Sequence, residues 1–194
     1  MDNILLIGAG GHAKSCIDII ELSKKFEVFG LIENTSSIKK ILGYKILGKD
    51  EDLSKFLNEV TNAHIAIGSL KSISLRNLLF QRVREIGFNT PVIFSKNSYV
   101  SKYSSVESGS IVMHDVFINA NSKIGVNSII NSKVLIEHDV SIGNNCHICP
   151  GVIINGGVEI GNNVFIGSGA IVFPGIKITS NTIIPAGITI KSNV

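Results

Sequence analysis

The strongest constraint on the fold is a six-residue hydrophobic repeat in the second half of the chain. From Val100 to Ile190, every sixth residue is valine or isoleucine. Small or aliphatic side chains lie two residues earlier, as at Ser98, Ser110, Val134, Cys146, Val152, Val158, Val164 and Ala170. Because side chains two apart on a strand share a face, each repeat supplies two inward residues and then turns. Neither an α-helix nor an antiparallel hairpin keeps this spacing, so the repeat predicts a parallel β-helix.

Turn-forming residues follow the inward aliphatic residues of the repeat. Glycine or asparagine comes directly after them at Asn119, Gly125, Asn131, Gly143, Asn155, Gly161 and Gly167. Both residue types tolerate a left-handed backbone, which tight corners require. The sequence therefore predicts that these positions form left-handed corners between short strands.

The composition excludes several classes of protein. Hydrophobic residues make up 44% of the chain and the mean hydropathy is +0.35, an excess that the valines and isoleucines of the repeat explain. No uninterrupted apolar run approaches the roughly 18 residues of a membrane span. The net charge of +3 is small and scattered, so it does not indicate nucleic-acid binding. The first residues, MDNILLIGAGGHA, lack a basic region, and we expect a first strand there and not a signal peptide.

The three cysteines give no disulfide framework. Without a secretory signal we expect Cys16, Cys146 and Cys149 to remain reduced in the cytoplasm. Cys146 and Cys149 match the C-x-x-C spacing of a metal or redox pair. The repeat places Cys146 on the inward face, however, and the sequence offers no second pair of ligands, whereas structural zinc requires four. We therefore expect no metal site.

The first 92 residues follow another pattern, in which short apolar strands alternate with amphipathic helices. Strands are expected at residues 3–7, 26–32 and 63–68, and helices at 14–25, 51–60 and 74–86. This alternation predicts a parallel sheet with right-handed crossovers, one half of a nucleotide-binding fold. We expect two domains, a small α/β domain at residues 1–92 and a β-helix at residues 93–194.

A glycine-rich turn follows the first expected strand. Gly8, Gly10 and Ala13 match the G-x-G-x-x-[GA] fingerprint at the start of a helix, whose free N–H groups suit a phosphate. Ligands of parallel sheets bind at the carboxyl ends of strands, where this turn lies. A dinucleotide-dependent dehydrogenase would need a second half-sheet and a substrate domain. The pattern therefore favours a nucleotide over NAD.

The glycine turn and one segment of the repeat array together resemble a known family. The segment runs from Asn131 to His147 and has the pattern N-x6-H-[DE]-x7-H, with His138 and Asp139 at its centre. With GAGGHA it is similar to the sialic acid O-acetyltransferase-like family, hexapeptide-repeat acetyltransferases that include UDP-4-amino-sugar (bacillosamine-type) and perosamine N-acetyltransferases. The resemblance covers nearly the whole chain. It implies a left-handed parallel β-helix with three hexads in each coil, in which residues 18 apart stack.

The resemblance also implies an activity and a set of site residues. The expected reaction moves the acetyl group of acetyl-CoA to the amino group of a nucleotide-linked amino sugar of the UDP-4-amino-4,6-dideoxy type. His138 matches the family's general base and Asp139 the acid that raises its basicity, while His147 matches a histidine that contacts acetyl-CoA. The nucleotide-sugar pocket falls on six residues of the N-terminal domain, Gly10, Gly11, His12, Glu33, Asn34 and Gly68.

Two departures from the family pattern concern ligand binding. The family often carries two carboxylates at the nucleotide loop, whereas this chain has Glu33 and Asn34. The family commonly ends in a glycine-valine-proline-alanine-lysine segment that helps to hold coenzyme A, whereas the last residues here are Lys191-Ser192-Asn193-Val194. The nucleotide and sugar therefore stay open, and we expect part of the cofactor tail site to be missing or supplied differently.

The residues around His138 suit acetyl transfer by their own chemistry. An amine that attacks a thioester loses a proton, which an imidazole accepts near neutral pH while a carboxylate stabilises the imidazolium. Among the five histidines, only His138 has acids on both sides, Glu137 and Asp139. Stacking places Gly156 beside His138, where its N–H stabilises the oxyanion or where the glycine only forms a corner.

Other stacked residues indicate where the cofactor and neighbouring chains would lie. Ser168 and Ala186 stack along one edge, along which the pantetheine arm is expected to run. His114 lacks the surrounding motif and is expected to be structural. The family forms trimers with the acetyl-CoA site between chains, and no long loop interrupts the array here. The resemblance thus implies a homotrimer, and because His138 and His147 are half a coil apart, we expect them to serve one site from two subunits.

Two other functions stay open at this point. O-acetylation of a sialic-type sugar would use the same base on a hydroxyl group. A non-catalytic nucleotide-sugar-binding or scaffold protein would use the array as structure alone, and the His138–Asp139 pair argues against this second alternative.

Overall fold

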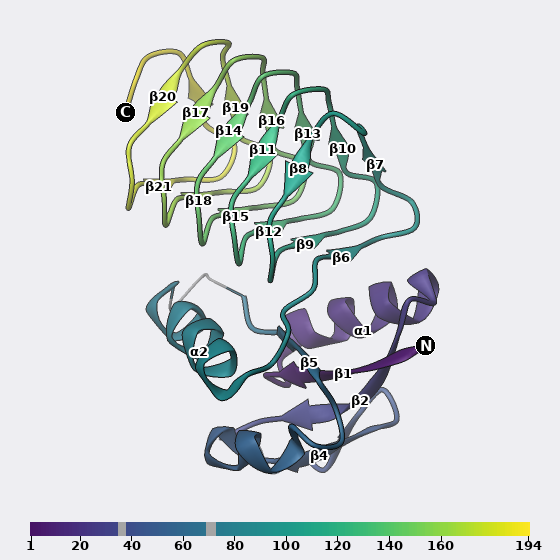
Figure 1. Ribbon diagram of the computed structural model, residues 1–194. Coiled ribbons are helices and arrows are strands. Elements are labelled where there is room, and N and C mark those ends of the chain that lie inside the picture. The colour runs from purple at the N-terminus through teal and green to yellow at the C-terminus, as the bar shows by residue number, and fades with distance from the viewer. Residues whose placement is uncertain (35–37, 69–72) are drawn as a thin grey trace. The chain divides into compact units, whose positions relative to one another are not determined.

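The computed structural model describes residues 1–34, 38–68 and 73–194 (Figure 1). They separate into two compact units, Met1–Pro91 and Val92–Val194. None of the helices in these described ranges is long and apolar enough to cross a membrane.

The first unit is a sheet with helices. Its strands are β1 (Asp2–Ile7), β2 (Phe26–Ile32), β3 (Lys40–Ile41), β4 (Tyr44–Gly48) and β5 (Asn62–Ile65). Its helices are α1 (Gly11–Ser23), the 3-10 helix η1 (Asp50–Phe56) and α2 (Ile73–Ile86). The strand order is β3-β4-β2-β1-β5, and every pair is parallel except β3 with β4. The expected half-Rossmann arrangement is confirmed.

Several element boundaries differ from those expected from the sequence. Helix α1 begins at Gly11, inside the glycine turn, and not at Lys14. The sequence pattern could not locate the start of this helix, because glycine has no side chain and adds nothing to the apolar periodicity. The helix expected at 51–60 is instead the short η1. Strands β3 and β4 were not predicted, because their half-exposed residues do not alternate between apolar and polar.

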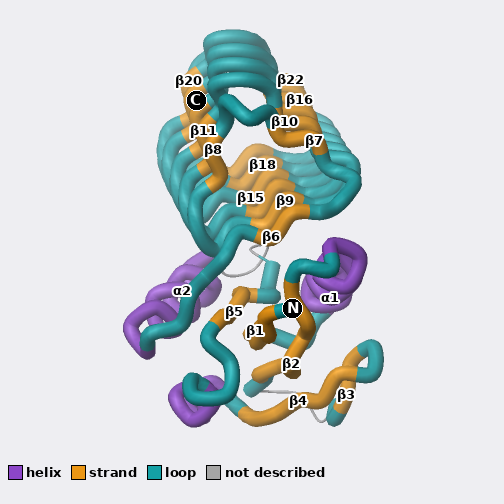
Figure 2. The backbone as a smooth tube through the Cα atoms, turned by 45° about the vertical axis from the view of Figure 1, so that its right-hand side comes forward, coloured by secondary structure: helices purple, strands orange, loops and turns teal. Residues whose placement is uncertain are grey.

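The second unit is a left-handed parallel β-helix of two-residue strands. These are β6 (Ile93–Phe94), β7 (Tyr99–Val100), β8 (Ser105–Val106), β9 (Ile111–Val112), β10 (Phe117–Ile118), β11 (Lys123–Ile124), β12 (Ile129–Ile130), β13 (Leu135–Ile136), β14 (Ser141–Ile142), β15 (His147–Ile148), β16 (Ile153–Ile154), β17 (Glu159–Ile160), β18 (Phe165–Ile166), β19 (Ile171–Val172), β20 (Lys177–Ile178), β21 (Ile183–Ile184) and β22 (Thr189–Ile190). They form three parallel sheets around one interior, which Figure 2 shows. We call these the β6–β21, β7–β22 and β8–β20 sheets after their outermost strands.

Stacking at a distance of 18 residues is confirmed. Leu135, for example, pairs with Phe117 in one direction and with Ile153 in the other. The valines and isoleucines of the repeat fill the interior, and from Val112 to Ile190 each is at most 9% exposed. Burying one such side chain stabilises the fold by roughly 1.5–3 kcal/mol, so this column supplies the main driving force for the β-helix.

The left-handed corners lie elsewhere than the sequence prediction placed them. A positive φ occurs at every sixth residue from Gly109 to Gly187, for example at Asn121 (60°) and Asp139 (61°). Gly125 and Gly143, which were expected to be corners, do not have a positive φ. Their neighbours in the next coil are so close that a side chain would not fit, so glycine supplies space there and not backbone freedom.

Candidate active site

His138 and Asp139 form a hydrogen-bonded pair at a corner of the β-helix. They follow strand β13, which fixes the chain direction into the corner. The imidazole Nδ1 of His138 lies 2.7 Å from the Oδ2 atom of Asp139. Because a carboxylate only accepts hydrogen bonds, the proton of a neutral imidazole is held on Nδ1 and the lone pair is on Nε2. This tautomer is the one that a general base requires.

Asp139 is ionised and held from two sides. Its second oxygen, Oδ1, accepts a hydrogen bond from the side-chain amide of Asn121 at 2.6 Å. The hydrogen bond from Asn121 and then that from His138 lower the pKa of the Asp139 carboxyl below its ordinary value. The acid on the other side of His138 has a different partner, since Oε2 of Glu137 accepts from the Asn119 amide at 2.8 Å. Of the two neighbouring acids, Asp139 is the one hydrogen-bonded to the imidazole.

Gly156 lies against the ring of His138, as the 18-residue spacing predicts. A Cβ atom added to Gly156 would lie 2.7 Å from Cε1 and 2.9 Å from Nε2 of His138. Gly156 and Gly157 together form the turn, and the left-handed φ of 69° is at Gly157, so the backbone conformation does not require glycine at position 156. Within the described chain, the Gly156 N–H has no hydrogen-bond partner. An open N–H and a basic nitrogen thus lie at the same corner.

His147 lies at a different place in the β-helix. It is 6% exposed on β15, where its ring packs edge-on against Phe165 with centroids 5.3 Å apart. Its Nε2 atom is 3.4 Å from the side-chain amide of Asn131. Ser168 and Ala186 are exposed at the corner that follows the β6–β21 sheet, and a hydrogen bond from the Gly187 N–H to the Ser168 carbonyl joins their coils. The structure therefore groups His147 with Asn131 and Phe165, and not with His138.

The glycine turn of the first unit leaves its backbone accessible. A Cβ atom added to Gly10, Gly11 or Gly68 would meet no atom within 4 Å. Packing therefore does not require glycine at these three positions, in contrast to Gly156. The side chain of Glu33 braces the turn, because its Oε2 atom accepts a hydrogen bond from the Ala9 N–H at 3.0 Å.

Asn34 is fixed by a residue that was not predicted from the sequence. Its amide donates to Oδ2 of Asp50 at 2.6 Å, and its Oδ1 accepts from the Asp50 N–H at 2.9 Å. Both residues border a cavity of about 140 Å³ that also reaches Gly8 and Glu33. Asp50 therefore supplies a carboxylate beside Asn34, in addition to that of Glu33, at the same cavity. No local pattern could reveal this, because the two residues are far apart in the sequence.

The imidazole of His64 and the guanidinium of Arg76 are buried in the first unit, and His64 lies near the half-buried His12 of α1. His64 on β5 is fully buried, and this burial, followed by the charges of Arg76 and His12, lowers its pKa well below the ordinary value. Arg76 on α2 is also buried and donates to the carbonyls of Ile65 and Ile67. The guanidinium thereby fixes the segment that leads from β5 towards Gly68.

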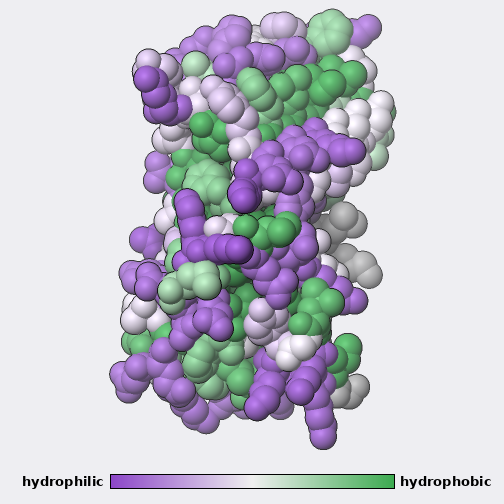
Figure 3. All heavy atoms as spheres, turned by 90° about the vertical axis from the view of Figure 1, so that its right-hand side faces the viewer, coloured by the Kyte–Doolittle hydropathy of each residue, from purple (hydrophilic) through white to green (hydrophobic). Residues whose placement is uncertain are grey.

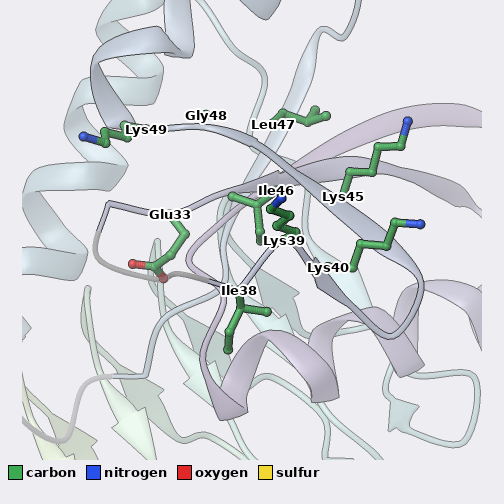
Figure 4. A pocket seen from close by; sticks show the side chains of 9 residues that line it. All are labelled: Glu33, Ile38, Lys39, Lys40, Lys45, Ile46, Leu47, Gly48 and Lys49. Carbon is green, nitrogen blue, oxygen red and sulfur yellow. The ribbon is translucent and has the colours of Figure 1, made fainter.

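A cavity of about 540 Å³ beside Glu33 has a strongly basic lining (Figure 4). Four of its nine lining residues are lysines, at Lys39, Lys40, Lys45 and Lys49. Lys40 pairs directly with Lys45 across β3 and β4, and Figure 4 shows their side chains pointing in the same direction. Among the described residues, none of the four lysines forms an ion pair. This basic cavity was not predicted, because β3 and β4 were not recognised as strands.

Comparisons with protein families match both units. Residues 3–83 match the model described as the PglD N-terminal domain. Residues 139–174 match the six-repeat bacterial transferase hexapeptide model, and residues 115–155 and 157–192 match the hexapeptide repeat of succinyl-transferase. A search of curated protein sequences gave no match.

Solved structures match the chain over its whole length. A structure from Caulobacter crescentus named PerB, in complex with CoA and GDP-perosamine, is 31% identical, with a TM-score of 0.93, covering 100% of this chain and 91% of that one. A histidine-to-asparagine variant of perosamine N-acetyltransferase from the same organism, with the same two ligands, is 30% identical, with a TM-score of 0.94 and coverage of 100% and 90%. The acetyltransferase domain of PglB from Neisseria gonorrhoeae is 24% identical (TM-score 0.93; coverage 100% and 93%) and supports the fold.

A β-helix of hexads that carries a His–Asp pair at one corner, preceded by a half-Rossmann unit, defines a hexapeptide-repeat acyltransferase. The identity of 30–31% over nine tenths of the Caulobacter enzyme narrows the class further. The chain belongs to the family of hexapeptide-repeat sugar acetyltransferases that contains this perosamine N-acetyltransferase. The chain's membership of the family that its sequence resembles is thereby confirmed.

Proposed function

We propose that this protein transfers the acetyl group of acetyl-CoA to the amino group of a nucleotide-linked amino sugar. The observation that carries the proposal is the His138–Asp139 pair, whose basic Nε2 atom lies beside the open backbone of Gly156. The related Caulobacter structures contain CoA and GDP-perosamine, a donor and an acceptor of these two classes.

The proposed chemistry uses three groups at this corner. Nε2 of His138 takes the proton that the amine loses as its nitrogen attacks the thioester carbonyl carbon. Asp139 stabilises the imidazolium that results, and the Gly156 N–H donates to the oxyanion of the tetrahedral intermediate. When the carbon–sulfur bond breaks, the imidazolium returns the proton to the departing thiolate, and the base is regenerated.

We place the nucleotide part of the substrate on the N-terminal unit. The backbone N–H groups at the start of α1, where Gly10, Gly11 and His12 lie, suit the phosphates. Glu33, Asn34 and Gly68 lie at the ends of the neighbouring strands, where such ligands bind. The lysine-lined cavity beside Glu33 adds the positive potential that attracts a nucleoside diphosphate.

A thiol-release assay tests this proposal. Purified protein is incubated with acetyl-CoA and a panel of UDP-, GDP- and dTDP-linked amino sugars, with free sialic acid as a competing acceptor. We expect release of coenzyme A with at least one nucleotide-linked amino sugar, and an N-acetyl product by mass spectrometry. Turnover with sialic acid alone would instead identify an O-acetyltransferase, and no turnover with any acceptor would favour a non-catalytic binding protein.

Replacing Gly11 by valine separates the two binding regions. The space around Gly11 is open, so the variant should fold, but the new side chain would occupy the backbone surface that faces the nucleotide. We expect calorimetry to show a loss of nucleotide-sugar affinity of at least about tenfold, or ~1.4 kcal/mol. Coenzyme A affinity should be unchanged and serves as the internal control. Loss of coenzyme A binding instead would assign the cofactor to the N-terminal unit.

We also propose that the β-helices associate as a homotrimer in which two chains complete each site. His138 lies at the corner between β13 of the β7–β22 sheet and β14 of the β8–β20 sheet, whereas His147 lies on β15 of the β6–β21 sheet, so one chain presents the two histidines at different places. We place coenzyme A along Ser168 and Ala186 of one chain, next to His147, and the acetyl acceptor at His138 of another. A second copy is what brings these groups to one site.

The outer face of the β7–β22 sheet suits contact with other copies. Its outward side chains from β7 to β19 are aromatic or aliphatic, and the rings of Tyr99 and Phe117 stack on it with centroids 4.8 Å apart. Figure 3 shows a hydrophobic area on the β-helix. The β8–β20 sheet instead presents polar side chains such as Lys123 and Glu159. We expect sedimentation to give about three times the 20.8 kDa of one chain, and a stable monomer at micromolar concentration would contradict the shared site.

The three cysteines are consistent with the cytoplasmic location that we propose. All three are buried and free. Burial raises the pKa of Cys16 to about 12 and those of Cys146 and Cys149 to about 11, so their thiols are protonated and unreactive at neutral pH.

A further inference from the structure

We propose that Asn121 is a positioning residue for the acetyl transfer, in that its amide holds the Asp139 carboxylate in the orientation that His138 requires. The proposal rests on the function proposed above for His138. Asn121 would not touch the substrate. It would act through Asp139, as the outermost member of a chain of hydrogen bonds that ends at the basic nitrogen.

The hydrogen bonds show how this would work. Asn121 donates to Oδ1 of Asp139 at 2.6 Å, and the Nδ1 atom of His138 lies 2.7 Å from Oδ2. Each carboxylate oxygen therefore has its own donor. Asp139 is exposed, so without the Asn121 amide its carboxylate would be free to rotate and to bond to water. The imidazole would then lose the fixed acceptor that selects its tautomer and its direction.

A purely structural role for Asn121 is the alternative. Asparagines form similar ladders at other corners, from Asn127 to Asn145 and from Asn163 to Asn181, each at 3.0 Å. The Asn121 bond is shorter at 2.6 Å, as expected when the acceptor is a carboxylate and not an amide. It differs from the other ladders in a second way, because its acceptor is bonded to a histidine.

The charges around Asp139 are few. His138 is the titratable group whose charge acts on it, and the bond from Asn121 contributes most to its lowered pKa. The next coil presents Gly157, which has no side chain, and Glu137 is bonded to Asn119. A substitution at Asn121 is therefore expected to affect the Asp139 carboxyl and, through it, the His138 imidazole.

Two substitutions preserve the corner and remove the donor. Asn121 has a φ of 60°, and corner positions in this chain accept both glycine, as at Gly157 (69°), and aspartate, as at Asp115 (57°). For both N121G and N121D we expect kcat to fall at least about tenfold, with unchanged KM for acetyl-CoA and for the amino sugar. The matched control is Asn163→Gly, which removes the same kind of ladder at a corner without a histidine. It should keep the kcat of the unaltered protein.

A second measurement tests the proposal without turnover. Carbon-13 NMR of the carboxyl groups follows the titration of Asp139, whose pKa should be higher in N121G than in the unaltered protein and unchanged in Asn163→Gly. An unchanged Asp139 titration in N121G would overturn the proposal. If no acceptor of the panel is acetylated, the proposed function fails, but the Asp139 titration still decides whether Asn121 holds this carboxylate.

Discussion

Replacing His138 by alanine is expected to reduce turnover by about 10²–10⁴-fold, the usual contribution of a general base. The fold should be unaffected, because the side chain is 61% exposed and lies outside the β-helix core. Thiol release under saturating acetyl-CoA measures the loss, and thermal unfolding together with sedimentation shows whether fold and assembly persist. Near-normal turnover of the variant would remove His138 from the mechanism.

The chain contains a matched control for the acid of this pair. His114–Asp115 repeats the His–Asp sequence, and Asp115 has a corner φ of 57°, close to the 61° of Asp139. The Nδ1 atom of His114, however, lies 2.7 Å from the hydroxyl of Ser95. Asp139→Asn should therefore reduce turnover, by less than loss of His138 because it tunes the base without removing it. Asp115→Asn should leave turnover unchanged.

The regular part of the fold could be predicted from the sequence because one rule generates it. A strict period of six fixes which side chains are inward, and coils of 18 residues fix which residues stack. The contact between His138 and Gly156, far from each other in sequence, follows from that rule alone. The position of a candidate base and of a candidate oxyanion donor was therefore accessible without a structure.

The polar contacts that orient the side chains of the candidate site could not be predicted from the repeat. Position 121 lies beneath position 139 by the same rule, but nothing in the sequence indicates that the Asn121 amide bonds to Asp139 and not to water. Asp50 reaches Asn34 across an irregular connection that follows no period. The lysine-lined cavity depends on the pairing of β3 with β4, whose short and half-exposed strands carry little signal.

The error about the corners shows that glycine has two uses that look alike in a sequence. Gly143 was expected to be a left-handed corner, yet a Cβ there would lie 2.7 Å from the carbonyl carbon of Gly161 in the next coil. At Gly151, by contrast, φ is 70° and a Cβ would meet no atom within 4 Å. The first glycine provides space for a neighbouring backbone, and the second provides a backbone conformation.

Gly143→Ala is therefore expected to destabilise the β-helix by about 3 kcal/mol, at the upper end of overpacking, because the clash is with backbone that hydrogen bonds hold in place on both sides. Gly151→Asn is the control, since asparagine occupies the preceding corner at Asn145 with a φ of 59°. It should change stability by no more than about 0.5 kcal/mol. Thermal unfolding at equal protein concentration compares the two variants. If Gly151→Asn were the more destabilising change, the steric role of Gly143 would be contradicted. The expectation from the sequence, that Gly143 is a left-handed corner, would then be favoured.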